Sequence, residues 1–328
     1  MDALADVLDV SRISGTILAH VHAREPWGLE LAPERGAAFH AVTAGSCWLQ
    51  LDGAPSVRLM PGDVVLLPTG APHRLLSAPG VAARRYDEET KAELTSEDGD
   101  LVIPGSGTAA RFLCASYDYD HEVAHPLLSL LPPVLHVPAA EADADTPVQA
   151  TLRLLSVELG RRRAGSRAVA ERLIEVLFVH AVRAWIDRTP DPSVASWLRG
   201  LRDPVVANAL ALLHEQPHRR WTAAELAHEV HVSRSTLVRR FGELVGEPPL
   251  GYLTRWRIDV AARLLRETDE TAGRIARRVG YTSEFAFSRA FARLRGEPPG
   301  RYRRRLRERF GDDAPPAGTA SRALAGGP

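Results

Sequence analysis

Two arginines fifty residues apart, Arg239 and Arg289, have the chemistry to read DNA bases. A guanidinium group is planar and permanently charged, and it can donate two parallel hydrogen bonds to O6 and N7 of guanine. The residues around each arginine offer further donors and acceptors. We expect the following side chains to face DNA: Arg234, Ser235, Val238 and Arg239 in the first segment, and Ser283, Glu284, Ser288 and Arg289 in the second.

Other residues in these segments suit different contacts. The Glu284 carboxylate can accept a hydrogen bond from the amino group of cytosine. We expect Arg240, Arg277 and Arg278 to contact phosphates, which adds affinity without sequence preference. Alternatively, arginines on an exposed helix are solvated or pair with a glutamate four residues away. For each single residue this alternative stays open.

An internal repeat contains both segments. Residues 225–252 match residues 274–302, with an offset of 49 residues in the first part and 50 in the second. The clearest pairs are Gly246-Glu247-Pro248-Pro249 with Gly296-Glu297-Pro298-Pro299, and Tyr252 with Tyr302. Each copy predicts a helix, a tight turn and a second helix.

The local signals place these elements. In the first copy, Ala223–Glu229 is a short helix, His231 and Val232 form the turn, and Ser233 caps the second helix. In the second copy, Gly280 is suited to a turn residue with positive φ. The predicted buried positions of the second helices are Leu237, Phe241, Phe287 and Phe291.

A helix at about 253–267 joins the two copies. If this helix holds them rigidly, both second helices can enter successive major grooves on one face of DNA, about 34 Å apart. One chain would then contact both half-sites.

The segment 202–310 resembles the DNA-binding domain of the AraC/XylS family of bacterial transcription regulators. The resemblance rests on Ile275-Ala276, Val279-Gly280-Tyr281-Thr282-Ser283, Phe287-Ser288-Arg289-Ala290-Phe291, Gly296, Pro298-Pro299 and Tyr302-Arg303, and on the matching residues of the first copy. It implies a seven-helix double helix-turn-helix domain that binds promoter DNA and often recruits RNA polymerase. Such regulators are usually activators.

Length and charge agree with a second, different domain. The chain has 328 residues, enough for two cores. Residues 1–150 carry 9 Lys and Arg against 21 Asp and Glu, whereas residues 217–310 carry 21 Arg against 11 Asp and Glu. A basic C-terminal segment suits a polyanionic partner. With no signal peptide and no apolar run long enough to cross a bilayer, we expect a cytoplasmic protein with no membrane partner.

Residues 1–138 predict an all-β barrel or sandwich, and the fold class is therefore α+β with several domains. The expected strands are Thr16–Val21, Ala37–Val42, Cys47–Leu51, Ser56–Leu59 and Val64–Leu67. Residues 87–107 are acidic and then rich in Gly and Ser, which predicts an exposed loop. The run Pro138–Asp145 marks the end of this domain.

Residues 147–200 predict a helical linker. Its helix at Ala168–Trp185 has an apolar stripe that either packs on its own domain or joins two subunits of a homodimer. The tail at 311–328 is rich in Gly, Ala and Pro, and we expect it to be disordered.

The N-terminal half also carries a recognisable motif. The spacing Gly62-x5-Pro68-x-Gly70-x2-His73 resembles the second motif of the cupin superfamily, although only His40 represents the first motif. Metal-binding cupins use three histidines and a carboxylate, and this chain lacks the full set. The resemblance leaves His40 and His73 as candidate ligands of an effector or a divalent metal, with Cys114 as a third. Each histidine is otherwise a hydrogen-bonded barrel residue.

Two further observations concern this half. His20 and His22 share one strand face, because side chains alternate along a strand. Cys47 and Cys114 are candidate redox residues, but both also suit a buried apolar position.

The sequence therefore predicts a transcription regulator and not an enzyme. An effector that is a small molecule, a metal or an oxidant would act on the cupin-like domain and change how the other domain meets a promoter. Two alternatives remain: a metal-dependent oxygenase or isomerase with a helical passenger, and a non-specific nucleic-acid packaging protein. The missing cupin ligands weigh against the first, and the two ordered turn-helix copies weigh against the second.

Overall fold

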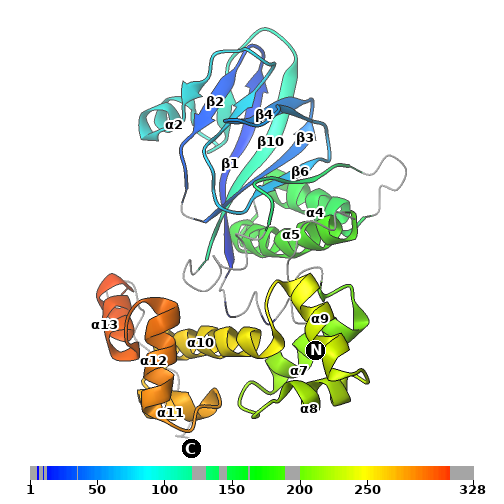
Figure 1. The fold of residues 1–328 in the computed structure, drawn as a ribbon. Coiled ribbons are helices and arrows are strands. Elements are labelled where there is room, and N and C mark those ends of the chain that lie inside the picture. The colour runs from blue at the N-terminus through cyan, green and yellow to red at the C-terminus, as the bar shows by residue number, and fades with distance from the viewer. Residues whose placement is uncertain are drawn as a thin grey trace, which may run out of the picture.

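The computed structural model describes residues 6, 10, 13–34, 36–119, 131–139, 146–161, 163–188 and 200–310. Figure 1 shows the strands gathered in one half and most of the helices in the other. The predicted tail at 311–328 lies outside these residues, as do positions 140–145 of the predicted boundary Pro138–Asp145. Within them, no helix combines the length and the apolar character needed to cross a membrane.

Two β-sheets form the N-terminal half. The six-stranded sheet has the order β11 (Leu135–Val137), β6 (Val64–Leu67), β3 (Ala37–Ala44), β10 (Ala109–Asp118), β1 (Ser14–Arg24) and β9 (Leu101–Ile103). The five-stranded sheet has the order β5 (Val57–Leu59), β4 (Cys47–Leu51), β7 (His73–Leu76), β2 (Gly28–Leu31) and β8 (Arg84–Arg85). Each predicted strand is present, and Cys47–Leu51 and Val64–Leu67 have the predicted bounds.

An apolar core lies between the two sheets. Val21 and Phe112 face it from the six-stranded sheet, and Leu49 and Leu75 face it from the other. The ring of Trp27 stacks on Phe112 at 5.2 Å between centroids. Side chains that alternate along each strand therefore divide the six-stranded sheet into an inner and an outer face.

Helices cover part of the outer face. α4 (Pro147–Arg161) and α5 (Ser166–Arg188) pack against each other, and α5 contacts β1 and β11. The Tyr117 hydroxyl of β10 donates a hydrogen bond to the Ile174 carbonyl of α5 at 2.8 Å. Ile174, Leu177 and Phe178 are buried in this contact, so the apolar stripe of α5 packs on the core of its own chain.

The prediction of an exposed loop at 87–107 is wrong for two stretches, whereas residues 104–107 are irregular and exposed. This segment contains α2 (Glu88–Leu94) and β9, which pairs with β1 in parallel. The carboxylate of Asp87 caps α2 by accepting from the Thr90 amide, and Glu88 and Glu89 occupy the first turn. Acidic residues are favourable at a helix N-terminus, and the acidic run therefore starts a helix.

Among the described residues, the C-terminal half contains seven helices. They are α7 (Pro204–Glu215), α8 (Ala223–Glu229), α9 (Arg234–Val245), α10 (Pro249–Glu267), α11 (Ala272–Arg278), α12 (Glu284–Arg295) and α13 (Pro299–Phe310). α10 lies between the α7–α9 group and the α11–α13 group (Figure 1). The count agrees with the double helix-turn-helix domain that the resemblance implies.

Candidate DNA-binding surface and buried histidine centre

The first helix-turn-helix unit consists of α8 and α9. Thr222 and Glu225 form a capping box at the start of α8, where each side chain bonds the backbone of the other residue. Ser233 caps α9, as predicted, by accepting from the Thr236 amide. Between them His231 has a φ of 57°, a left-handed turn conformation that is uncommon for a residue with a side chain.

The second unit repeats this geometry in α11 and α12. Gly280 has the predicted positive φ, 90°, at the position that matches His231. Ser283 caps α12 through the Ala286 amide. Phe287, Phe291 and Tyr302 pack in series with their rings steeply inclined, at centroid separations of 5.7 and 5.2 Å, and they belong to the core of the unit.

Side chains of α10 fix the two units to each other. The Arg257 guanidinium donates to the carbonyls of Pro217 and Arg219 at 2.6 and 2.8 Å, in the loop before α8. The same guanidinium lies 5.8 Å from the centre of the Tyr281 ring, in the turn of the second unit. A single side chain of α10 therefore contacts both units.

A buried ion pair holds α12 on α10. Arg295 donates to the Asp259 carboxylate at 2.6 Å, and each side chain is only 5% exposed. The charge of either partner alone would be costly at this depth, so the pair restrains the orientation of α12. α10 has 19 residues and a length of about 28 Å at 1.5 Å per residue. This length is comparable with one turn of the DNA duplex, about 34 Å.

Most of the predicted DNA-binding side chains are exposed with the rest of the chain present. The exposed ones are Arg234, Ser235, Val238, Arg239, Ser283, Glu284 and Arg289, and the partly exposed ones are Arg240 and Ser288. No described part of the N-terminal half covers them. The outward faces of α9 and α12 are therefore accessible to DNA.

Several of these side chains have partners within the chain, among them Arg239, Arg240 and Glu284. Arg239 forms two hydrogen bonds to Glu243, at 3.0 and 2.9 Å, the i,i+4 pair that was the alternative to a base contact. Arg240 bonds the carboxylate of Asp203, which also caps α7. The carboxylate of Glu284 lies against Gly273 in the first turn of α11, where the positive end of that helix attracts it.

Phe285 is a further surface residue of α12, not among the predicted DNA-facing side chains. It is 72% exposed, the largest exposure among the described large apolar side chains. The Arg289 guanidinium lies 5.8 Å from its ring. Its place in the repeat was the available signal, because Phe285 occupies the position of Ser235 in the first copy.

The structure brings the three candidate ligands of the N-terminal half together. His40 lies on β3, Cys114 on β10 and His73 on β7 of the facing sheet. His40 Nδ1 is 3.1 Å from Cys114 Sγ, and His40 Nε2 is 2.7 Å from His73 Nε2. All three side chains are buried in the core between the sheets.

Hydrogen bonding determines the protonation of this centre. His73 Nδ1 donates to the Ala71 carbonyl at 2.8 Å, so its Nε2 is an acceptor in the neutral ring. His40 Nε2 must then donate to His73, which leaves His40 Nδ1 to accept from the Cys114 thiol. Burial lowers the pKa of both histidines, and His73 further lowers that of His40. The neutral state of these hydrogen-bonded side chains is therefore favoured.

This arrangement does not fit one metal ion held by all three residues. Cys114 and His73 approach opposite nitrogens of the His40 ring, whereas a shared ion needs one ligand atom from each residue around a single point. Burial raises the pKa of Cys114, and it raises the pKa of Cys47 to about 12. Both cysteines are free. Their redox role stays a prediction, and their protonated state does not favour attack by a thiolate.

Comparisons with known proteins cover both halves. A family model described as a cupin matches residues 2–187, more than half of the chain, and a helix-turn-helix domain model matches residues 226–305. A putative AraC-like transcription regulator of Streptomyces lividans is 40% identical over 93% of this chain and 98% of its own length. One from Streptomyces antibioticus is 39% identical over 93% and 99%.

A more distant relative is the RCS-specific HTH-type transcriptional activator RclR of Escherichia coli, 28% identical over 94% of this chain and 99% of its own length. These relatives are named as regulators of transcription, which removes the enzyme alternative. The seven C-terminal helices, the two capped turns and the whole-length relatives lead to one conclusion. The chain belongs to the AraC-like family of DNA-binding transcription regulators, with a cupin N-terminal half and a helix-turn-helix C-terminal half.

Proposed function

We propose that the chain activates transcription by binding a promoter through α9 and α12 together, under the control of a signal received in the cupin half. The observation that carries this proposal is the exposure of both outward helix faces on units that Arg257 and the Asp259–Arg295 pair hold together. The name of one whole-length relative includes the word activator, which supports this direction of regulation.

Base contacts are assigned to Arg239 and Arg289, which occupy matching positions of the two units. Each Arg→Ala variant removes a bidentate contact and should weaken binding to the cognate site by ~1–3 kcal/mol. Arg307→Ala is the matched control, because it removes an exposed arginine of α13 that pairs with Asp269. Glu243→Gln, which releases Arg239 from its ion pair, should leave cognate binding intact or strengthen it.

The cognate site is first located by footprinting the DNA upstream of the gene that encodes the chain. Binding to this site and to a duplex of random sequence is then measured by fluorescence anisotropy. Loss on the cognate duplex with little change on the random one supports base reading. Equal losses on both duplexes would reassign the arginine to a phosphate contact.

The buried chain of His40, His73 and Cys114 is the proposed receiver of the signal. It connects the two sheets through polar atoms in an apolar core, and buried polar groups that lose their partners destabilise their surroundings by ~1–3 kcal/mol each. An effector that engages any of these atoms would therefore alter the packing between the sheets. In vitro transcription with RNA polymerase, comparing oxidant, metal ions and candidate small molecules, distinguishes the signal classes.

Cys114→Ser keeps a hydrogen-bond donor next to His40, whereas Cys114→Ala removes it. A response to oxidant that both variants lose depends on the sulfur. If both variants respond to every effector as the unchanged chain does, the signal is received elsewhere.

A homodimer with its contact on α4 and α5 is also proposed. The stripe of α5 named above is used within the chain, but both helices carry other apolar side chains at helical spacing that are exposed: Leu154 and Val157 on α4, and Val169 and Val176 on α5. Substitution of Leu154 and Val157 by Ser should shift sedimentation towards the monomer. A chain that is monomeric before substitution would exclude this interface.

A further inference from the structure

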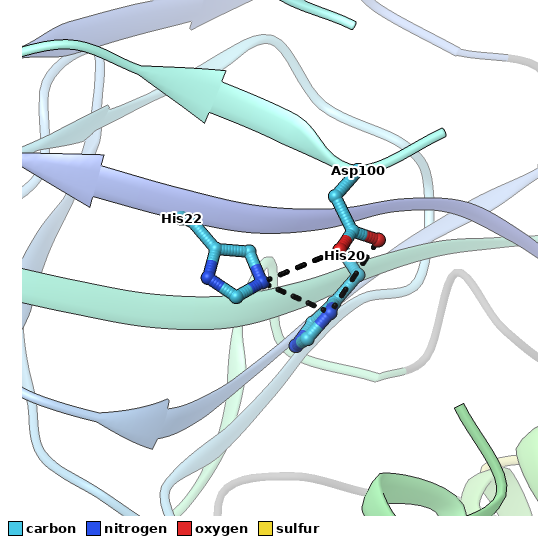
Figure 2. A group of neighbouring side chains, drawn as sticks. All are labelled: His20, His22 and Asp100. Atoms are coloured by element: carbon cyan, nitrogen blue, oxygen red, sulfur yellow. Dashed lines mark hydrogen bonds and ion pairs between the residues drawn. The ribbon is translucent and has the colours of Figure 1, made fainter. Parts of the chain in front are cut away.

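Two histidines and an aspartate converge on the outer face of the six-stranded sheet. His20 and His22 alternate with Val21 on β1, and Val21 is buried between the sheets, so both imidazoles point outward. Asp100 precedes β9, whose Leu101 pairs with Val21 in the parallel register. Figure 2 shows the three side chains directed towards a common point.

The ligand atoms lie close together, all within 4.8 Å of one another. His20 Nδ1 is 3.3 Å from His22 Nε2 and 3.7 Å from one Asp100 oxygen, and His22 Nε2 is 3.6 Å from the other oxygen. For a tetrahedral ion with ligand distances of 2.0–2.1 Å, neighbouring ligand atoms are about 3.3 Å apart. The two imidazole nitrogens have this separation already. The two contacts with Asp100, each made to a different carboxylate oxygen, are longer by a few tenths of an ångström.

The ligand types select a class of ion. Two imidazoles with one carboxylate suit zinc and neighbouring divalent transition metals, whereas magnesium and calcium prefer all-oxygen sites. The side chains of His20, His22 and Asp100 are 27%, 34% and 27% exposed, so an ion can enter from solvent and keep a position for water or another ligand.

We propose that His20, His22 and Asp100 bind one divalent transition-metal ion. Among the residues the structure describes, this is the group of His, Cys and acidic side chains whose ligand atoms all lie within 4.8 Å of one another. The site is separate from the buried chain of His40, His73 and Cys114, which faces the opposite side of the sheet. It rests on its own geometry and does not depend on the proposed role of the chain in transcription.

An ion here would join β1 to the edge of its sheet. β9 is the last strand of the sheet, and Asp100 belongs to a turn in which its amide donates to Ser96 Oγ at 3.2 Å and its carbonyl accepts from the Ser96 amide at 2.8 Å. A metal ion that binds only the folded chain raises the free energy of unfolding, and above the dissociation constant this gain grows with the logarithm of the metal concentration. Metal should therefore raise the melting temperature.

The test is Zn²⁺ titration of the full chain after removal of metals, in competition with a chromogenic chelator, together with Co²⁺ absorption spectra. We expect one Zn²⁺ to bind per chain. Added Mg²⁺ should not displace it, because Mg²⁺ prefers all-oxygen sites. His20→Gln, His22→Gln and Asp100→Asn should each weaken the affinity by at least ~10-fold, because each removes one ligand, and losing only a hydrogen-bond partner of a ligand already costs about 10–100-fold.

Two matched controls sharpen the test. Asp98→Asn removes an exposed carboxylate from the same turn and should leave the affinity unchanged. Arg111 on β10 lies opposite His22 on β1. Arg111→Gln removes a positive charge that repels the metal ion, and it should therefore tighten metal binding. Circular dichroism and the rise in melting temperature with Zn²⁺ show whether each variant folds. Asp100→Asn is the least disruptive ligand variant, since it keeps the side-chain shape.

Several results would overturn the site. Asp98→Asn and Asp100→Asn could lose affinity equally, which would indicate diffuse attraction by the acidic turn. Zn²⁺ could be retained by the His20 and His22 variants and lost by Cys114→Ser, which would place the ion at the buried chain instead. Failure of the unchanged protein to bind Zn²⁺ or Co²⁺ would exclude the site directly, whatever the result for DNA binding.

Discussion

Burial changes the acid–base chemistry of three histidines. His40, His73 and His214 are buried, and burial lowers the pKa of each from 6.5. The His214 ring lies 3.9 Å from the Trp256 ring in a parallel stack, and its Nε2 is 2.7 Å from the Tyr252 hydroxyl. Each ring is therefore kept neutral by an apolar environment that disfavours the imidazolium.

The first prediction concerns acid stability. Since the folded chain binds these protons less readily than the unfolded chain, the free energy of unfolding should fall as pH decreases below 6.5. The slope is up to ~1.4 kcal/mol per pH unit for each buried histidine until its folded pKa is reached. Urea denaturation between about pH 7 and pH 5 measures it. His214→Gln should reduce the slope, with the exposed His228→Gln as control, and a flat profile would contradict the assignment.

The second prediction concerns the turn of the second unit. A Cβ at Gly280 would be strained at a φ of 90° and would lie 2.8 Å from the His218 backbone and from Arg257. Gly280→Ala should therefore lower the free energy of unfolding by ~1–3 kcal/mol. Gly242→Ala is the control, because Gly242 lies within α9 with no atom near its Cβ position, and it should stabilise by ~0.5–1 kcal/mol. Equal effects in denaturant titrations would refute this account.

Among the elements, the duplication is visible in side-chain contacts as well as in helices. Glu247 pairs with Arg255 above Tyr252, and fifty residues later Glu297 pairs with Arg305 above Tyr302. α10 and α13 both begin at a proline, Pro249 and Pro299, where a missing backbone N–H costs nothing. α10 differs because it serves both units, and its side chains set their relative orientation.

The third prediction tests that role. Arg257→Gln removes the guanidinium that bonds the Pro217 and Arg219 carbonyls, and it should lower the free energy of unfolding by ~1–3 kcal/mol. It should weaken binding to DNA that carries both half-sites by about tenfold, because roughly 1.4 kcal/mol of fixed orientation is lost, and it should spare DNA with one half-site. Arg307→Gln, an exposed ion pair, should cost at most ~1 kcal/mol. Equal losses on both DNA duplexes would show that Arg257 does not couple the units.

At the scale of the whole molecule, the acidic and basic halves touch at a specific contact. The Asp6 carboxylate lies 3.3 Å from Nδ1 of His214 in α7, although the two residues are 208 positions apart. Burial lowers the pKa of His214, and Asp6 opposes this shift. Asp6 is therefore an electrostatic partner of His214 in the DNA-binding half.

The fourth prediction follows from this contact. Asp6→Asn removes the charge that favours the imidazolium, so the pKa of His214 should fall further. NMR titration of the histidine ring protons measures the change. Asp52→Asn is the control, because it removes an exposed carboxylate elsewhere in the N-terminal half. An unchanged pKa would mean that Asp6 does not lie against α7 in solution.

Local patterns in the sequence determined most of the helical half. Caps such as Asp203, Thr222 and Ser233, the positive φ of Gly280 and the apolar spacing act within a few residues, so their consequences can be predicted from neighbours alone. The same holds for the strands at Cys47–Leu51 and Val64–Leu67. Even the missed α2 had a local signal in Asp87, which the acidic composition of its segment obscured.

Only the tertiary structure decided which distant side chains meet. The parallel pairing of β9 with β1 brings Asp100 to His20 and His22, and the facing of two sheets brings His73 to His40. The same is true of Arg240, which meets Asp203 across the chain. Strand order and sheet packing result from the burial of the whole core, which is non-directional and sums over many residues, so no short pattern in the sequence encodes them.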